Sequence, residues 1–125
     1  MQLNVNFSVL KFIIVRLSIF LALVSSVTNA TPKETLTLTP EQCVSLTQGQ
    51  KCYVDATLSW SSPIKGNYCL FSSQQMSPLF CWRQKQEGHF SKEFIADKNI
   101  IFTLKQDGGA EIKAEQKLKV TWVHQ

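Results

Sequence analysis

The sequence predicts an all-β fold, a small antiparallel β-sandwich with Ig-like layering, about seven strands and two disulfides. Three observations support this prediction. Apolar and polar residues alternate in several short stretches, as they do in half-buried strands. Polar segments rich in Ser, Gly and Pro separate these stretches, and no convincing long helix interrupts them. The chain of 125 residues is long enough for one domain, and it carries four cysteines.

Residues 1–30 have the features of a secretory signal peptide. Lys11 precedes a largely apolar run over residues 12–27, and Arg16 interrupts that run. The small residues Thr28 and Ala30 predict cleavage after Ala30. A membrane span needs about 20 apolar residues, and this run is shorter and contains an arginine. The alternative interpretation is an uncleaved N-terminal anchor.

Cleavage leaves a single mature domain, residues 31–125, whose charge differs from that of the precursor. The basic count falls from 13 to 11 while the acidic count stays at 9, so the formal net charge falls from +4 to +2. This weak positive charge and the exported location argue against nucleic acid as a partner. We expect no stable membrane span after cleavage.

An even number of cysteines in an exported domain predicts disulfides. The four are Cys43, Cys52, Cys69 and Cys81. The count leaves three pairings open, but strand register favours the local pairs 43–52 and 69–81. The second pair aligns two apolar stretches as a hairpin, with Leu70 opposite Phe80. The first pair forms another hairpin, with Val44 opposite Lys51.

The first half of the domain contains the clearest strand pattern. A short strand is predicted over residues 35–39, where a proline follows. Apolar side chains then alternate with polar ones over 52–60, which is typical of a half-buried strand. The Ser, Pro and Gly content of 61–67 predicts a loop. Strands over 68–71 and 79–83 follow as the disulfide-linked hairpin.

The second half is predicted to contain strands separated by polar turns. The expected elements are a turn at 84–88, a strand at 90–96, a turn at 97–99, a strand at 100–105, a hairpin turn at 107–109 and a strand at 110–123. Fully extended, the last strand would span about 46 Å at 3.3 Å per residue, so we expect a bend or bulge near Glu115 and Gln116. A short helix over 110–119 is the alternative, because Ala, Glu, Lys and Gln favour helix.

The tryptophans and their neighbours are candidates either for the core or for contact with a partner. Trp60 and Trp122 lie on the apolar side of predicted strands, which favours the core. Trp82 shares one side of the predicted hairpin with Tyr68 and Phe80, opposite the cystine. If the cystine faces the core, this aromatic side is exposed and contacts a partner. If the aromatic side is the core, the cystine lies outside.

No constellation of catalytic residues is recognisable. His89 falls in a predicted turn and His124 at the C-terminus, and the motif G-x-S-x-G is absent. Asp97 and Asp107 are conceivable as paired carboxylates, but both fall in predicted turns, where Asp is common. The cysteine spacing lacks the close C-x2-C pairs of a zinc site. We therefore expect no enzyme, no metal and no cofactor.

Several short segments occur in the order seen in a known family. They are LTLTP (36–40), EQCV (41–44), GQKC (49–52), Trp60, YCL (68–70), PLFCW (78–82) and VTWV (120–123). Together they resemble a family of small exported proteins of Gram-negative bacteria that carries a domain of unknown function, over essentially the whole mature domain. The resemblance implies export, a compact β domain and no assigned activity. Gene neighbours that are two-component regulators would point to envelope sensing.

These observations predict an exported, non-enzymatic binding or accessory protein of the bacterial envelope, either periplasmic or secreted. The alternative is a periplasmic accessory to a stress-sensing or two-component regulatory system. The expected partner is another envelope protein, contacted through Tyr68, Phe80 and Trp82. The sequence does not define the oligomeric state.

Overall fold

The computed structural model describes Ser26 and residues 31–124, so the predicted signal peptide lies almost entirely outside the described residues. The compact unit Pro32–Gln125 is separate from Met1–Thr31, and between residues 31 and 124 it contains strands and no helix. The strands are β1 (Thr35–Thr39), β2 (Gln42–Thr47), β3 (Cys52–Ser72), β4 (Phe80–Ala96), β5 (Ile100–Gln106) and β6 (Ile112–His124).

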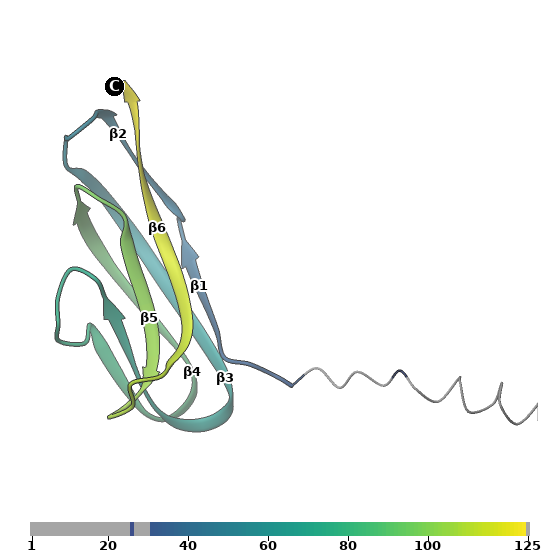
Figure 1. Ribbon diagram of the computed structural model, residues 1–125. Helices are drawn as coiled ribbons and strands as arrows, with labels where there is room; N and C mark the ends of the chain where they lie inside the picture. Colours follow the sequence, from purple (N-terminus) through teal and green to yellow (C-terminus); the bar gives the residue numbers. More distant parts are fainter. Residues whose placement is uncertain (1–25, 27–30, 125) are drawn as a thin grey trace, which may run out of the picture. The chain divides into compact units, whose positions relative to one another are not determined.

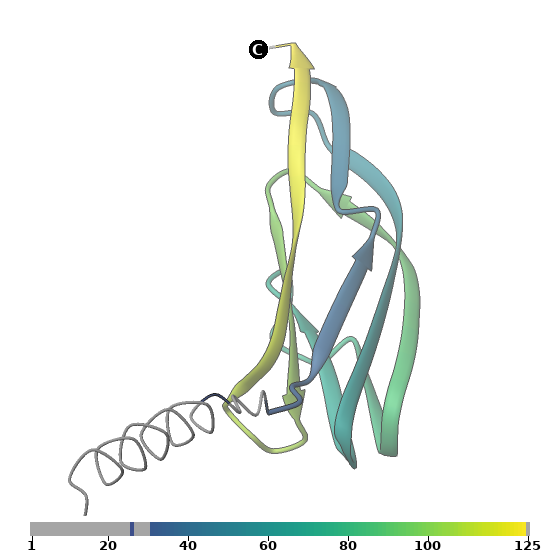
Figure 2. The ribbon, with the colours of Figure 1, turned by 90° about the vertical axis from the view of Figure 1, so that its right-hand side faces the viewer.

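The six strands form one curled sheet in the order β1-β3-β5-β6-β2, with β4 paired to β3 outside this path (Figure 1). β3 pairs antiparallel with β1 through residues 57–61 and with β5 through residues 68–72. β5 pairs antiparallel with β6, and β6 pairs in parallel with β2. Figure 2 shows β2 and β6 side by side. The prediction of an all-β domain with two disulfides is confirmed.

There are six strands and not about seven because β3 and β4 are longer than predicted. They form one antiparallel hairpin that extends from the pair Cys52↔Ala96 to the pair Leu70↔Phe80. The predicted loop over 61–67 is therefore wrong, since these residues belong to β3. The predicted turn at 84–88 is wrong for the same reason, since it lies within β4.

Bulges take the place of both predicted chain breaks. The register shifts between Ser61 and Gly66 and again between Gly66 and Tyr68. On the facing strand Gln84 has a positive φ of 51°. A bulge bends and twists a strand while its pairing continues on either side. The Ser, Pro and Gly residues thus mark a bend in a continuous hairpin.

A buried hydroxyl network fixes the bulged part of β3. The Tyr68 hydroxyl donates to the Ile64 carbonyl at 2.7 Å and lies 2.8 Å from Ser62 Oγ. Ser62 Oγ also accepts a hydrogen bond from the Ile64 backbone N–H at 3.1 Å. Because Tyr68 is completely buried, these bonds satisfy polar groups that water cannot reach.

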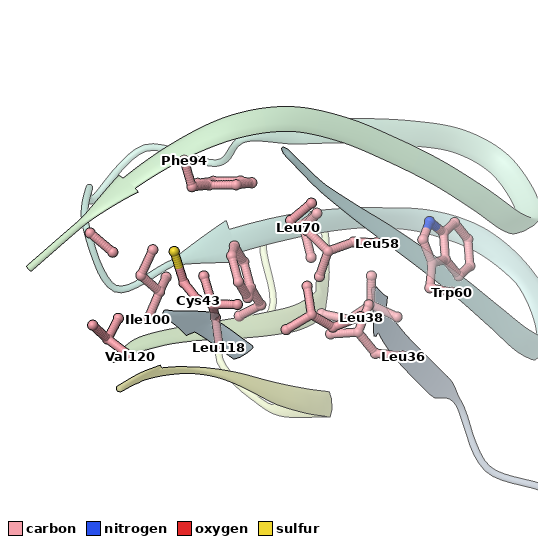
Figure 3. Close-up of a cluster of buried hydrophobic side chains, with 14 of the residues drawn as sticks. Leu36, Leu38, Cys43, Leu58, Trp60, Leu70, Phe94, Ile100, Leu118 and Val120 are labelled. Atoms are coloured by element: carbon pink, nitrogen blue, oxygen red, sulfur yellow. The ribbon is translucent and has the colours of Figure 1, made fainter. Parts of the chain in front are cut away.

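The core forms where the inward side chains of β1, β3, β5 and β6 meet (Figure 3). The alternation predicted for 52–60 is confirmed, with Leu58 and Trp60 nearly inaccessible to solvent. Phe102 of β5 and Leu118 of β6 are fully buried. Trp122, also predicted for the core, is half-buried and packs against it. Each large apolar side chain contributes about 1.5–3 kcal/mol by leaving water.

The hairpin of β5 and β6 follows the predicted turn, and β6 has an irregularity close to the predicted bend or bulge. Gly108 has a φ of 77°, and the Gly109 N–H donates to the Gln106 carbonyl at 2.9 Å. The segment predicted as a strand or a helix is the strand β6 from residue 112. Its register shift lies at Lys113, so the irregularity occurs just before the predicted position. Gln116, the polar residue on the apolar side of β6, donates from Nε2 to the Leu36 carbonyl at 2.9 Å.

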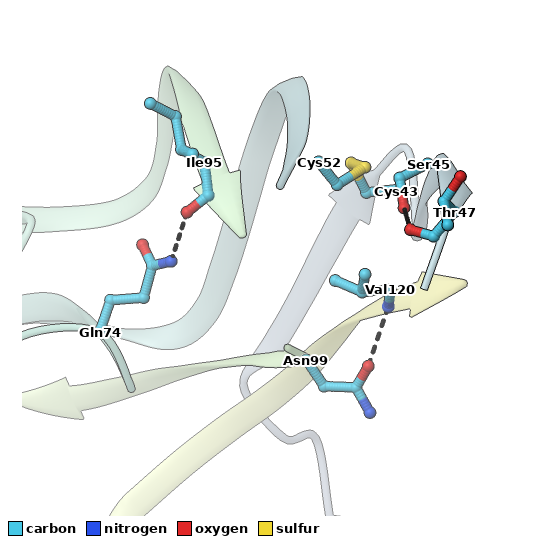
Figure 4. The surroundings of a disulfide bond; sticks show 8 residues. All are labelled: Cys43, Ser45, Thr47, Cys52, Gln74, Ile95, Asn99 and Val120. Carbon is cyan, nitrogen blue, oxygen red and sulfur yellow. Dashed lines mark hydrogen bonds between the residues drawn. A yellow bond between two sulfur atoms is a disulfide. The ribbon is translucent and has the colours of Figure 1, made fainter. Parts of the chain in front are cut away.

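The disulfide Cys43–Cys52 joins β2 to the start of β3, and the two Cα atoms are 6.1 Å apart (Figure 4). The predicted pairing is confirmed, but the predicted hairpin with Val44 opposite Lys51 is wrong. β2 instead pairs in parallel with β6. The bond therefore cross-links two segments that are not ladder partners in the described structure.

Candidate functional site

The second disulfide determines which side of the β3/β4 hairpin faces the core. Cys69 and Cys81 are directly opposite each other, with Cα atoms 4.1 Å apart, as predicted. The adjacent pair Leu70↔Phe80 also has the predicted register. Tyr68 and Leu70, on the other side of the strand, have no solvent exposure, whereas Cys81 is exposed. The aromatic side is therefore the core side, and the cystine lies on the opposite side of the hairpin, where Cys81 is exposed and Cys69 is buried.

The predicted contact residues differ greatly in exposure. Tyr68 is fully buried, so it offers no surface to a partner. Trp82 is half-buried and packs against the core, while Phe80 is 48% exposed. Contact through Phe80 and Trp82 stays a prediction, centred on Phe80.

Phe80 belongs to a small cluster that we call the aromatic patch, made of Leu79, Phe80, Trp82 and Phe90. The Phe80 ring centroid lies 4.8 Å from that of Trp82 and 6.2 Å from that of Phe90. Trp82 in turn lies 5.4 Å from Trp60 of the core, in an edge-on arrangement. Rings at these distances attract each other beyond the effect of area burial. The patch is thus a partly exposed extension of the core.

Gly88 makes this aromatic packing sterically feasible. A Cβ at this position would lie 2.7 Å from Trp82 Nε1 and still closer to Trp60 Nε1. Gly88 is directly opposite Trp60 in the hairpin. Sequence reasoning missed this role because the glycine fell in a predicted turn.

The opposite side of the same strands is a surface that sequence reasoning did not identify. We call it the polar face. Its residues alternate with the buried ones on β1, β3 and β4: Thr35, Thr37, Thr39, Asp55, Thr57, Ser59, Ser61, Glu87, His89, Ser91 and Glu93. All are exposed except Ser59, which is half-exposed. The alternation was visible in the sequence, but the order of the strands was not.

Hydrogen bonds between neighbouring strands organise the polar face. Thr35 Oγ1 lies 2.6 Å from Ser61 Oγ, and Thr57 Oγ1 lies 2.9 Å from Ser91 Oγ. Ser59 Oγ lies 2.8 Å from His89 Nδ1. Such cross-strand pairs stabilise a sheet by about 0.2–1 kcal/mol each. They also hold the hydroxyl groups in a regular array.

The polar face carries three carboxylates, and the exposed Lys85 lies two residues from one of them, Glu87, on β4. The three are those of Asp55, Glu87 and Glu93. Asp55 and Glu93 are direct cross-strand partners, an arrangement in which like charges repel. Among residues 31–124 the one ion pair joins Lys113 to Glu111 at 3.2 Å, away from this face. None of these three carboxylates forms an ion pair within residues 31–124.

The contact of Ser59 with His89 does not by itself make a catalytic site. A serine nucleophile also requires a group that orients the histidine and donors for an oxyanion. Here both side chains lie on the outer surface of a sheet as a cross-strand pair. The second histidine, His124, ends β6 and is exposed.

The predicted carboxylate pair is not brought together. Asp97 precedes β5 and Asp107 follows it, so they lie at opposite ends of that strand. Asp97 does line a pocket of about 380 Å³ with Ser73, Gln74 and Asn99. The two side-chain amides that line the pocket form hydrogen bonds with the backbone of neighbouring strands. Gln74 donates to the Ile95 carbonyl at 2.8 Å, and Asn99 accepts from the Val120 N–H (Figure 4).

The described part of the chain also lacks two further features. Ser26 and residues 31–124 contain no helix long and apolar enough to cross a membrane. The same residues contain no cluster of three or more His, Cys, Asp or Glu side chains arranged to hold a metal ion.

The fold and the two surfaces define a small disulfide-linked all-β domain. Residues 36–125 match the model of the family described as "Protein of unknown function (DUF3019)". The chain belongs to this family, and the domain of unknown function expected from the short segments is confirmed. Comparisons with curated proteins and with solved structures found no match.

Proposed function

We propose that this domain is an exported, non-enzymatic binding protein of the bacterial envelope, periplasmic or secreted, that contacts another envelope protein through the aromatic patch. The observation that carries the proposal is the exposure of Phe80. This side chain is 48% exposed although it packs between Trp82 and Phe90. An aromatic residue anchored by its neighbours loses little conformational freedom on binding and buries much apolar area, which is typical of interface anchors.

The disulfides support the exported location. Both Cys43–Cys52 and Cys69–Cys81 form, and the described residues contain no free cysteine. Disulfides persist in oxidising compartments and are rare where thiols are kept reduced. In the chain-entropy view, loops of this size each stabilise the domain by roughly 2.5–3 kcal/mol.

Strand pairing supports a two-layer, Ig-like organisation of the curled sheet. The half of the hairpin that contains residues 52–61 and 87–96 pairs with β1. The half nearer the tip, from residue 66 on β3, pairs with β5, and the pairing continues to β6 and β2. In this interpretation the bulges in β3 and β4 are the points at which each strand passes from one layer to the other.

Export is tested by fractionation and cystine mapping in the cells that produce the protein. We expect the mature chain to begin at Thr31, to be released by osmotic shock and to contain both disulfides in a non-reducing peptide map. A chain that stays in the cytoplasm with reduced cysteines would contradict the proposal.

Contact through the patch is tested by site-specific photo-crosslinking in the same cells. A photoreactive phenylalanine analogue at Phe80 is expected to form a discrete cross-link with an envelope protein. Ile112, 50% exposed but outside the patch, is the matched control position. In a second version of the protein, the photoreactive residue replaces Phe90 instead of Phe80. In that version the substitution Phe80→Ser should abolish the cross-link while the fold is retained. Identical products from positions 80 and 112 would refute the role of the patch.

A further inference from the structure

The outer edge of β4 has no strand partner, because among residues 31–124 β4 pairs with β3 alone. In an antiparallel pair the N–H and C=O of one residue point to the same side, and the side alternates along the strand. The Ser59 carbonyl points to β1, where it accepts from Thr37 Oγ1 at 3.3 Å. Its partner on β4, His89, therefore turns its own N–H and C=O to the free edge. The Ile95 carbonyl points the same way, where it accepts from Gln74.

The free edge of β4 is limited at both ends. By the same alternation, the backbone groups of every second residue from 87 to 93 point away from β3. Gln74 covers the edge at Ile95, and the positive φ of Gln84 bends the strand beyond the other end. The opposite edge of this layer differs, because the Leu36 carbonyl of β1 accepts from Gln116 Nε2. An uncovered edge of this kind is a template for another strand.

We propose that two copies of this chain dimerise through the outer edges of β4, which pair antiparallel about a twofold axis at His89. In this register Lys85 of each copy lies opposite Glu93 of the other, so the contact contains two ion pairs. Both side chains are exposed, and neither forms an ion pair within residues 31–124. A twofold contact uses the same surface on both copies, and complementary charges fix its register.

The charges along β4 favour this register over its neighbours. A displacement by two residues in one direction places Glu87 opposite Glu93, where like charges repel. The same displacement in the other direction places Arg83 opposite Glu93. Arg83 lies beyond the bend at Gln84, so it does not continue the straight edge. A displacement by one residue forms no ladder, because it pairs backbone groups that face the edge with groups that face β3.

The same register gives the partly exposed Phe90 an apolar neighbour. It sets Phe90 of each copy beside Gly88 of the other, on the inner side of the sheet. Gly88 has no side chain to shield the strand, and an aromatic ring beside an edge glycine supplies that cover. Phe90 already packs against the core of its own copy. The contact therefore extends the buried apolar surface from one copy to the other.

This dimer goes beyond the proposed function, because its partner is a second copy and its contact is the β4 edge instead of Phe80. Phe80 lies on the far side of the bend at Gln84. Phe80→Ser is therefore expected to leave dimerisation unchanged. A missing cross-link at Phe80 would count against the aromatic patch and not against the dimer, so the two proposals can fail separately.

Sedimentation equilibrium of the mature, disulfide-bonded chain tests the dimer. We expect the mass to rise from that of one chain to that of two as the concentration increases. Lys85→Glu and Glu93→Lys should each raise the dissociation constant about tenfold, because each turns two attractive contacts into two repulsive ones. An equimolar mixture of the two variants should dimerise again, since the charges of their edges are then complementary. Lys117→Glu makes the same change at an exposed lysine of β6 and should have no effect.

Amide hydrogen exchange locates the contact on the chain. The N–H groups of His89 and Ser91 face the free edge, so they should exchange at least about tenfold more slowly in the dimer than in the monomer. The N–H of Phe90 faces β3 and should be protected in both states. A chain that stays monomeric at every concentration would overturn the proposal. So would a dimer that Lys85→Glu and Glu93→Lys do not weaken, or one in which His89 and Ser91 exchange as fast as in the monomer.

Discussion

The two sides of the β3/β4 hairpin are built from alternating residues of the same strands, yet they obey different constraints. On the inner side Gly88 has no room for a methyl group, because Trp60 and Trp82 occupy the space. On the outer side its neighbour His89 is exposed and makes a single cross-strand contact with Ser59. Gly88 and His89 are adjacent in sequence, yet a larger side chain clashes with the core at Gly88, whereas the side chain of His89 lies in solvent.

This difference places most of the stabilising contacts on one side of the hairpin. The inner side contributes buried area and aromatic contacts, and only its margin at Phe80 reaches solvent. The outer side contributes a hydroxyl array and unneutralised carboxylates, which add little to folding. Substitutions at adjacent residues provide the sharpest way to test this division.

The largest effect is expected from Gly88→Ala. The new Cβ would overlap the indoles of Trp60 and Trp82, and overpacking of this kind costs about 2–3 kcal/mol or more. Urea unfolding followed by tryptophan fluorescence measures the loss directly. His89→Ala, one residue away on the polar face, is the matched control and should cost at most about 1 kcal/mol. If Gly88→Ala and His89→Ala lowered the free energy of unfolding equally, the two sides of the hairpin would not differ in their contribution to stability.

A medium effect is expected from Tyr68→Phe, which removes only the buried hydroxyl. The Ile64 carbonyl and the Ser62 hydroxyl would each lose a partner inside the bulge of β3. We expect a loss of about 1–2 kcal/mol in the free energy of unfolding, with faster amide exchange at residues 62 and 64–66. Tyr53→Phe removes the same atom from a side chain that is 63% exposed and should change stability by less than about 0.5 kcal/mol.

Local sequence patterns predicted those parts of the fold that depend on local information. The alternation over 52–60, the turn around Gly108 and both cystine pairs are confirmed. The loop at 61–67 was predicted from its Ser, Pro and Gly content. Composition indicates the local conformational preference of a segment, but it does not show which strand the segment pairs with. β4 lies along β3 on both sides of the bulge and keeps the segment extended.

Other features depend on partners that are distant in sequence. The parallel pairing of β2 with β6 brings Gln42 beside Lys119, and no local pattern signals such a contact. For the same reason the polar face was not recognised as a surface. Thr35 and Thr37 could be read as the outer side of one strand, but their position beside Ser61 and Ser59 depends on sheet order.

The smallest effect has the opposite sign and tests the polar face most directly. Asp55→Asn keeps the shape of the side chain and removes one of two like charges that face each other across β3 and β4. We expect the domain to gain about 0.2–1 kcal/mol in stability, and the gain should shrink at high salt because the repulsion is screened. Urea unfolding at low and high ionic strength measures both. A loss of stability would mean that Asp55 supports the sheet, and the interpretation of the Asp55–Glu93 pair as repulsive would have to be abandoned.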